Sequence, residues 1–179
     1  MSFIKLLEQY QAYDAAEASI HQEMLTFAKN NPHCLERSLA IGHITTSAWI
    51  TDHNRKYVLL THHRKLNKWL QLGGHADGES NLHKSAMKEA TEESGLTGIV
   101  FYMDNIFDVD IHLIPARKLE PAHYHYDIRF LMEADKHAPL IINHESKELT
   151  WMHIDRVIQV NPEESIMRMV RKHKELFNV

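Results

Sequence analysis

The spacing of apolar residues along the chain predicts a helical segment followed by a larger region in which strands and helices alternate. Near the N-terminus Met24, Phe27 and Ala28 follow the 3.6-residue period of a helix, and Asn30-Asn31-Pro32 ends the pattern. We therefore expect an N-terminal helical extension over residues 1–39. Its apolar stripe must be buried, so the extension acts as a lid, as a dimer arm or by packing against the rest of the chain.

From His43 onward the period changes to two, which is the side-chain period of a β-strand. Strands are predicted over residues 43–50, 57–61, 69–72, 99–101, 107–113, 123–132 and 149–154. Helices are predicted over residues 82–94 and from Asn161-Pro162 onward, where asparagine suits an N-cap and proline the first turn. No linker interrupts this order of elements. We expect one domain over residues 40–179, of the α/β class, with a mixed sheet flanked by helices.

The two longest predicted strands have one apolar face and one polar face. The polar face carries Asp108, Asp110, His112, His123, His125, Asp127 and Arg129. Such alternation is typical of a sheet that packs one side on the core. We expect the polar side to meet solvent, with contact to a ligand as the alternative.

Composition and charge exclude several classes of protein. The 179 residues carry a formal charge of −4 and no long basic run, which argues against a nucleic-acid or acidic-membrane binder. The one cysteine cannot form an internal disulfide, and no signal peptide or membrane-spanning apolar run is present, so we expect a cytoplasmic protein. The 15 histidines are scattered without HExxH or Cys/His zinc spacing, and we expect most to lie at the surface or along strands.

The segment Gly73 to Leu96 carries the strongest chemical signal. On a helix over residues 82–94, Glu89, Glu92 and Glu93 fall within an arc of about 100°. Like charges at these spacings repel each other, and a hard divalent cation such as Mg²⁺ or Mn²⁺ would relieve the repulsion. Glycines just before the helix let the backbone approach a ligand closely. The alternative is a solvated acidic helix face.

This segment resembles the Nudix box of MutT-like Nudix hydrolases. In the box a glycine is followed by five residues, Glu, seven residues, Arg-Glu, an aliphatic residue, any residue, Glu-Glu, any residue, Gly and an aliphatic residue. The stretch Lys88 to Leu96 differs from it by lysine in place of arginine and by the small Ala90. Counting from Gly74, the first glutamate is shifted by one position, to Glu79, while the helical glutamates keep the expected spacing.

The resemblance implies the α/β/α sandwich of Nudix proteins and a pyrophosphohydrolase that uses Mg²⁺ or Mn²⁺. It implies metal binding by Glu89, Glu92, Glu93 and the Gly73 carbonyl, with Glu92 and Glu93 also in catalysis. Glu79 becomes an outer-site candidate, and Lys88 stands where a family arginine orients a ligand. The substrate is expected to be a small-molecule nucleoside diphosphate joined to another group, with ADP-ribose-like molecules or nucleotide sugars preferred.

Residues outside the box complete the predicted site. Arg64, Lys65 and Lys68 form a basic cluster that could bind substrate phosphates, although a solvated loop explains them equally well. Glu145, in a polar loop beyond the box, is the favoured general base, ahead of Glu148 and Glu120. A box glutamate serving as the base is the alternative to all three.

Two other functions stay open. An enzyme of the isopentenyl-diphosphate isomerase type, related to the family, needs a reactive cysteine, and Cys34 in the extension is the sole candidate. A Nudix module that only binds a nucleotide is expected to have lost box carboxylates, whereas all three helical ones are present. A homodimer is possible.

Overall fold

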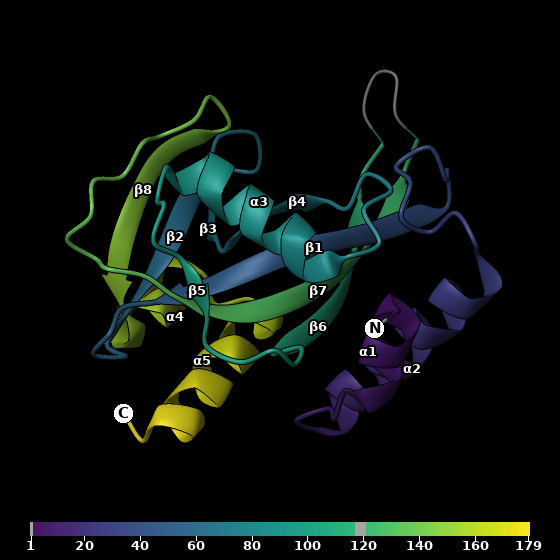
Figure 1. The fold of residues 1–179 in the computed structure, drawn as a ribbon, viewed down its shortest axis with the longest axis horizontal. Helices are drawn as coiled ribbons and strands as arrows, with labels where there is room; N and C mark the ends of the chain where they lie inside the picture. The colour runs from purple at the N-terminus through teal and green to yellow at the C-terminus, as the bar shows by residue number, and fades with distance from the viewer. Residues whose placement is uncertain (1, 117–120) are drawn as a thin grey trace. The chain divides into compact units, whose positions relative to one another are not determined.

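The computed structural model describes residues 2–116 and 121–179 (Figure 1). The helices are α1 (Phe3–Gln9), α2 (Ala15–Asn30), α3 (Leu82–Ser94), α4 (Ile154–Val160) and α5 (Glu164–Phe177). The strands are β1 (Gly42–Thr51), β2 (Tyr57–His63), β3 (Lys68–Leu70), β4 (Leu72–His75), β5 (Val100–Phe101), β6 (Asp108–Ile114), β7 (His123–Glu133) and β8 (Ser146–His153). Every strand predicted from the alternation has a counterpart, and α3 spans the predicted residues.

The chain forms two compact units. The first comprises Met1–Ser47, Gly74–Ala86 and Met103–Phe130, and the second comprises Ala48–Gly73, Met87–Tyr102 and Leu131–Val179. Strands β1 and β7 run through both units, as does helix α3. The boundary between an extension and a domain at residues 39 and 40 stays a prediction.

The sheet is mixed, as the sequence predicts. β1 and β7 run parallel: Tyr124 N–H donates to the Ile41 carbonyl in the first unit, and Ala134 N–H donates to the Thr51 carbonyl in the second. β6 pairs with β7 antiparallel in the first unit. In the second unit the order is β3-β2-β1-β7-β5, with β8 antiparallel to β2.

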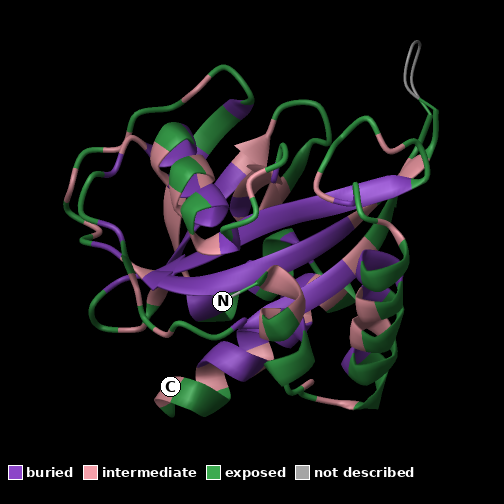
Figure 2. Cartoon of the chain, turned by 45° about the vertical axis from the view of Figure 1, so that its right-hand side comes forward, coloured by how far each residue is buried: buried purple, intermediate pink, exposed green. Residues whose placement is uncertain are grey.

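Strand β1 is buried along its whole length (Figure 2). In the second unit its Trp49 donates from Nε1 to His173 Nδ1 of α5 at 3.3 Å. His173 Nε2 in turn lies 2.8 Å from the Arg55 carbonyl, just before β2. These contacts join α5 to the strands by hydrogen bonds as well as by its apolar face, which buries Ile166 and Met169.

The N-terminal helices pack within the first unit. Ser2 caps α1, as its sequence position suggests. α2 contacts β6, and its Phe27 ring stacks on Tyr126 with ring centroids 3.8 Å apart. The buried Glu17 of α2 accepts a hydrogen bond from the Val109 backbone N–H of β6 at 3.2 Å. Among the three roles considered for this segment, these contacts favour packing.

The polar face of the β6–β7 pair is largely buried, so the prediction that it faces solvent is wrong. Asp108, Asp110, Asp127 and Arg129 are all buried. Arg129 donates from Nε to Asp127 at 2.8 Å, from Nη1 to Asp108 at 3.0 Å and from Nη2 to Asp110 at 3.3 Å. One guanidinium thus neutralises carboxylates from both strands, which alternation alone could not reveal.

The hydroxyl groups of β1 complete this network. Thr45 donates to Asp127 at 3.0 Å, and Ser47 donates to the same carboxylate at 2.8 Å. Asp110 and Asp127 lie directly opposite each other in the β6–β7 register, an arrangement that is unfavourable for like charges. The guanidinium of Arg129 is therefore what makes this pairing stable.

Both ends of α3 have residues that are typical of helix caps. Asn81 Oδ1 accepts from the Lys84 backbone N–H at 3.2 Å, which is the N-cap bond. Gly95, with φ of 72°, donates its N–H to the Thr91 carbonyl at 2.8 Å. A Cβ there would lie 2.6 Å from the Ile141 side chain, so the position requires glycine. Among the described helices, none is long and apolar enough to cross a membrane.

Replacing Arg129 by methionine should lower the free energy of unfolding by about 3–5 kcal/mol, because three buried carboxylates lose their cation. Urea unfolding followed by circular dichroism measures the change. The control is Arg37→Met, which breaks the exposed pair with Asp77 and should cost less than about 1 kcal/mol. Similar losses in the two variants would contradict a stabilising role for the buried network.

Candidate active site

Helix α3 presents three glutamates that differ in exposure. Glu93 is buried, with 6 % of its surface exposed. The Glu89 side chain is 18 % exposed, and that of Glu92 is 59 % exposed. The exposure of these side chains thus decreases from Glu92, which meets solvent, through Glu89 to Glu93, which lies in the interior of the second unit.

The buried Glu93 carboxylate is held by a glycine of strand β4, which precedes α3 in the chain. Gly73 N–H donates to Glu93 Oε2 at 2.8 Å. Burial is the main cause that raises the pKa of Glu93 to about 7; the charges of Glu89 and Glu145 contribute in the same direction, and the hydrogen bond from Gly73 opposes them. A carboxyl group in this setting needs a proton or a nearby cation.

Lys88 is a protein cation beside the helical acids. Its Nζ lies 3.6 Å from Glu89 and 3.7 Å from Glu92. The lysine side chain is more than half exposed, so solvent screens its charge. A supporting role for Lys88 therefore fits its position.

Glu145 comes close enough to Glu93 to affect its pKa, although the two residues are 52 positions apart in sequence. The loop that carries Glu145 is fastened to the end of β2 by Arg64. The Arg64 backbone N–H donates to the Glu145 carbonyl at 2.8 Å, and its guanidinium donates to the carbonyls of His144 (3.1 Å) and Ser146 (2.9 Å). Arg64 thus positions the predicted base, a role that the sequence did not suggest.

The two lysines predicted to bind phosphate differ in whether they form an ion pair. Lys68 forms an ion pair with Glu163, at the start of α5. Lys65 is exposed and makes no ion pair with any residue that the structure describes. Lys65 therefore has the freest charge of the three, and phosphate binding by all three stays a prediction.

The remaining candidate acids are placed less favourably. Glu79, in the first unit, accepts from Lys84 Nζ at 2.7 Å and from the Asn81 N–H at 2.9 Å. The bond from Lys84 holds the pKa of Glu79 below its usual range. Glu148 lies exposed on β8, opposite His62 of β2. Glu120 lies outside the described residues.

A group of histidines that the sequence pattern did not single out gathers in the first unit. We name it the histidine cluster, and its members are His43, His75, His112, His123 and His125. The ring centroid of His43 lies 4.9 Å from the ring centroids of His75 and His125 and 5.1 Å from that of His123. The available signal was the His-x-His repeat at residues 123 and 125, but the partner at residue 43 is remote in sequence.

Cys34 does not have the surroundings of a reactive thiol. It is buried, and burial raises its pKa, which disfavours the thiolate that acts as a nucleophile. Its sulfur lies 3.9 Å from the Ala28 carbonyl. The isomerase alternative, which depends on this residue, loses its chemical basis.

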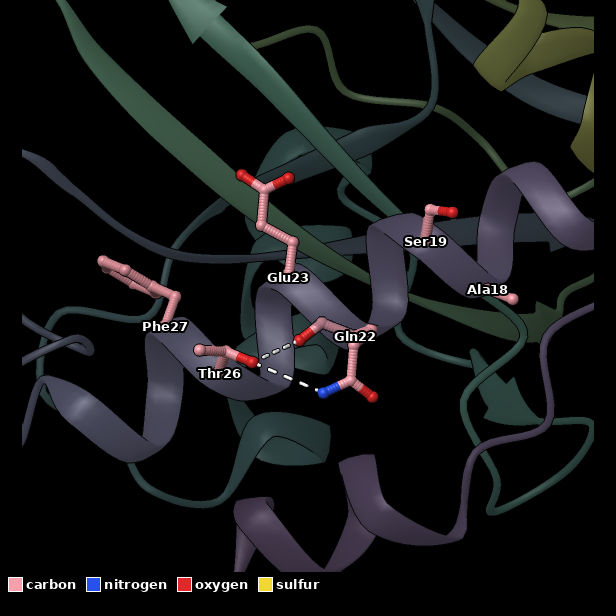
Figure 3. Close-up of a pocket in the computed structure, with 6 residues that line it drawn as sticks. All are labelled: Ala18, Ser19, Gln22, Glu23, Thr26 and Phe27. Carbon is pink, nitrogen blue, oxygen red and sulfur yellow. Dashed lines mark hydrogen bonds between the residues drawn. The ribbon is translucent and has the colours of Figure 1, made fainter.

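A cavity along α2 contains none of the predicted site residues (Figure 3). Its lining residues are Ala18, Ser19, Gln22, Glu23, Thr26 and Phe27. The cavity is open and mostly apolar, and it offers Glu23 as its one charged side chain. It lacks the grouped carboxylates that a metal-diphosphate site requires.

The carboxylates of α3 fit a hard divalent cation. Oxygen donors are what Mg²⁺ and Mn²⁺ prefer, and Glu93 and Glu89 supply them from one helix face. The raised pKa of Glu93, caused chiefly by burial and in smaller part by the charges of Glu89 and Glu145, means that its ionised form is disfavoured there. A divalent ion at this face would favour the ionised carboxylate.

The family model of the NUDIX domain matches residues 42–173 of this chain. The chain belongs to the Nudix family. The resemblance seen in the box is thereby confirmed, and with it the assignment as a Nudix hydrolase, a pyrophosphohydrolase. No protein of curated function matches the chain.

Solved structures share the fold of this Nudix protein. An Ap4A hydrolase of C. elegans, in a binary complex, is 15 % identical with a TM-score of 0.61, covering 75 % of this chain and 97 % of that one. A NUDIX-family hydrolase from Clostridium perfringens is 24 % identical with a TM-score of 0.56, over 75 % and 97 % of the two chains.

A third structure, the NUDIX domain of Shewanella oneidensis NrtR in complex with ADP ribose, is 13 % identical with a TM-score of 0.53, over 74 % and 86 %. At these identities the likeness concerns the fold alone. It confirms the expected α/β class.

The raised pKa of Glu93 predicts a pH dependence of stability in the metal-free protein. Between pH 4.5 and about 7 the folded chain keeps a proton on Glu93 that the unfolded chain releases, so stability falls as pH rises through this range. The loss is at most about 3 kcal/mol. Urea unfolding in EDTA at several pH values, compared with Glu93→Gln, measures it.

The glutamine variant has no carboxyl group to titrate at this position. Its stability should therefore exceed that of wild type by an amount that grows from pH 4.5 to pH 7 and is constant above. Parallel stability curves for the two proteins would show that Glu93 titrates normally.

Proposed function

We propose that this Nudix protein is a Mg²⁺- or Mn²⁺-dependent hydrolase that cleaves the diphosphate linkage of a nucleoside diphosphate joined to another group. The observation that carries the proposal is the buried Glu93 carboxylate, held by Gly73 and surrounded by the charges of Glu89 and Glu145. Such clustered acids are stabilised by a divalent ion that also binds substrate phosphates.

Glu89, Glu92 and Glu93 would hold the ion, with the Gly73 carbonyl as a further oxygen donor. Glu93 and Gly73 are already joined by a hydrogen bond, so the peptide of Gly73 lies beside the carboxylate. The ion, when bound, polarises phosphoryl oxygens, lowers the pKa of the attacking water and neutralises the leaving phosphate.

Glu145 is the proposed general base, which takes a proton from water as the water attacks phosphorus. Two observations support this role over Glu148: the charge of Glu145 acts on Glu93, and Arg64 fastens its loop. The Glu145 side chain is 45 % exposed, so water can reach it. A box glutamate acting as the base remains the competing assignment.

The basic residues near β2 would neutralise the substrate phosphates. Lys65 makes no ion pair with a described residue and could bind a phosphate directly. Lys68 would exchange its partner Glu163 for a phosphate. Arg64 would bind with the guanidinium N–H groups that do not contact the Glu145 loop. Lys88 would keep the exposed end of the acidic face oriented. Glu79, held by Lys84, is proposed only for an outer metal site.

The preferred substrates are ADP-ribose-like molecules and nucleotide sugars. The complex of the NrtR domain with ADP ribose and the Ap4A hydrolase of C. elegans show that proteins of this fold take nucleotide derivatives. Carrying that substrate class to this chain is an analogy of fold. A nucleotide-binding module without catalysis is disfavoured because all three helical glutamates are present.

A substrate panel tests the proposal, and Glu93→Gln tests its central residue. The panel contains ADP-ribose, dinucleoside polyphosphates, NADH, nucleotide sugars and nucleoside triphosphates, each with Mg²⁺, with Mn²⁺ and with EDTA. We expect metal-dependent cleavage of one class. Glu93→Gln should cut turnover at least about a hundredfold on that substrate, because a neutral amide replaces a charged ligand.

The matched control is Glu175→Gln, which makes the same chemical change on the exposed side of α5 and should keep wild-type turnover. Thermal melts of both variants verify that they are folded. Near-normal metal-dependent turnover by Glu93→Gln would refute the proposed metal site. Cleavage that is equally fast in EDTA would refute metal dependence.

Glu145→Gln should lower kcat by about 10²- to 10⁴-fold with KM nearly unchanged, because the water loses its proton acceptor. Removing this negative charge should also lower the pKa of Glu93, which a titration of the metal-free protein detects. The same substitution at Glu148 tests the competing base on β8. Wild-type turnover by Glu145→Gln from pH 6 to pH 9 would assign the base to another residue.

A further inference from the structure

Three imidazoles of the histidine cluster, those of His43, His123 and His125, come from two strands that are remote in sequence. His43 is the second residue of β1, and His123 and His125 lie at the start of β7. Because β1 and β7 pair here, with Tyr124 N–H donating to the Ile41 carbonyl at 3.1 Å, the three side chains meet. All of them belong to the first unit, whereas the helical glutamates belong to the second.

The distances among these three imidazoles suit metal coordination. One ring nitrogen from each of His43, His123 and His125 lies within 4.8 Å of the other two. The Nε2 atoms of His123 and His125 are 3.3 Å apart. Two nitrogens bound to one tetrahedral Zn²⁺ at about 2.0–2.1 Å are separated by about 3.4 Å, so small side-chain rotations would bring all three into range.

His43 lacks the partners that a buried polar side chain normally has. It is 3 % exposed, and neither ring nitrogen makes a hydrogen bond with a described residue. Its interaction with the Leu39 backbone acts weakly on the pKa and falls short of hydrogen-bond geometry. Buried polar groups without partners are rare in folded proteins, and a bound ion is one of the recognised reasons for them.

The tautomer of His123 directs a lone pair toward the cluster. His123 Nδ1 lies 2.9 Å from the Pro121 carbonyl, which can only accept, so Nδ1 carries the proton. Nε2 is then unprotonated and lies on the side of His125. A backbone carbonyl that fixes the outer nitrogen is the usual second contact of a metal-binding histidine.

The imidazoles are in the charge state that binds metal. Burial chiefly, together with the neighbouring histidines, lowers the pKa of His43 to about 4 and that of His125 to about 2. At neutral pH these two rings are therefore uncharged, as coordination requires. Protonation at neutral pH therefore does not compensate for the missing hydrogen bonds of the His43 ring.

We propose that His43, His123 and His125 form a binding site for a borderline divalent transition metal, with Zn²⁺ as its ion. Three imidazoles with no carboxylate among them select Zn²⁺ and similar ions over Mg²⁺, which prefers oxygen ligands. Three protein ligands leave a fourth tetrahedral position open. The His75 ring, with its centroid 4.9 Å from that of His43 and 5.0 Å from that of His125, borders this position.

The test measures Zn²⁺ binding by the full chain after treatment with EDTA and its removal. Competition with a chromophoric chelator gives the affinity, and excess Mg²⁺ keeps the helical glutamates occupied. His125→Asn and His43→Leu should each lower the affinity for the most tightly bound Zn²⁺ ion by at least about a hundredfold. The control His137→Asn, which alters an exposed histidine outside the cluster, should leave the affinity unchanged.

Two further measurements do not depend on the folding of a single variant. Co²⁺ added to the wild-type chain should give the intense visible absorption of a tetrahedral complex, and added Zn²⁺ should abolish it. His43→Leu should melt no lower than wild type without metal, because its ring makes no hydrogen bond to lose, and Zn²⁺ should raise the melting temperature of the wild type alone.

Three results would overturn the proposal. One is a weak, octahedral-type Co²⁺ spectrum on the wild-type chain. Another is equal loss of Zn²⁺ affinity in His137→Asn and His125→Asn, which would assign binding to scattered surface histidines. The third is unchanged Zn²⁺ affinity in both cluster variants. None of these results bears on the hydrolase, whose test uses Glu93.

Discussion

The hydrogen bond from Gly73 N–H to the buried Glu93 carboxylate is the contact on which the catalytic half of this molecule depends. This hydrogen bond joins strand β4 to helix α3 and holds the Glu93 carboxylate in its buried position. Burial raises the pKa of Glu93 to about 7, and the charges of Glu89 and Glu145 act in the same direction. A buried carboxylate of this kind is stabilised by a proton or a cation, and this requirement is the basis of the proposed metal-dependent chemistry.

Arg64 shows how the same unit organises its second acid. Its guanidinium is directed at main-chain carbonyls on both sides of Glu145, so its fixed fork of donors holds the loop rather than a single side chain. The position of Glu145 relative to β2 is thus set by backbone contacts. Arg64, for which the sequence left phosphate binding and a solvated loop open, therefore acts on the loop that carries the proposed base.

The first unit contains two groups of polar side chains that are balanced differently. In the β6–β7 pair, Arg129 balances Asp108, Asp110 and Asp127 with charge-assisted hydrogen bonds, and β1 adds hydroxyl donors. The histidine cluster at the other end of the same strands has no such internal balance. The ring nitrogens of the buried His43 make no hydrogen bond with a described residue, and burial keeps His43 and His125 uncharged at neutral pH. A borderline metal is therefore the ligand that the chemistry of the cluster fits.

Helix α4 was not predicted, and Asn161, which was expected to begin the last helix, is instead the C-cap of α4. The sequence by itself determined the order of the strands, the position of α3, and the acidic face of Glu89, Glu92 and Glu93. These features depend on local spacing, which the 2.0 and 3.6 periods report directly. Tertiary structure alone decided that the polar face of β6 and β7 is buried, that Arg64 holds the Glu145 loop, and that His43 meets His125. Each of these rests on pairing between segments remote in sequence, because alternation shows which side chains share a face but not what covers that face.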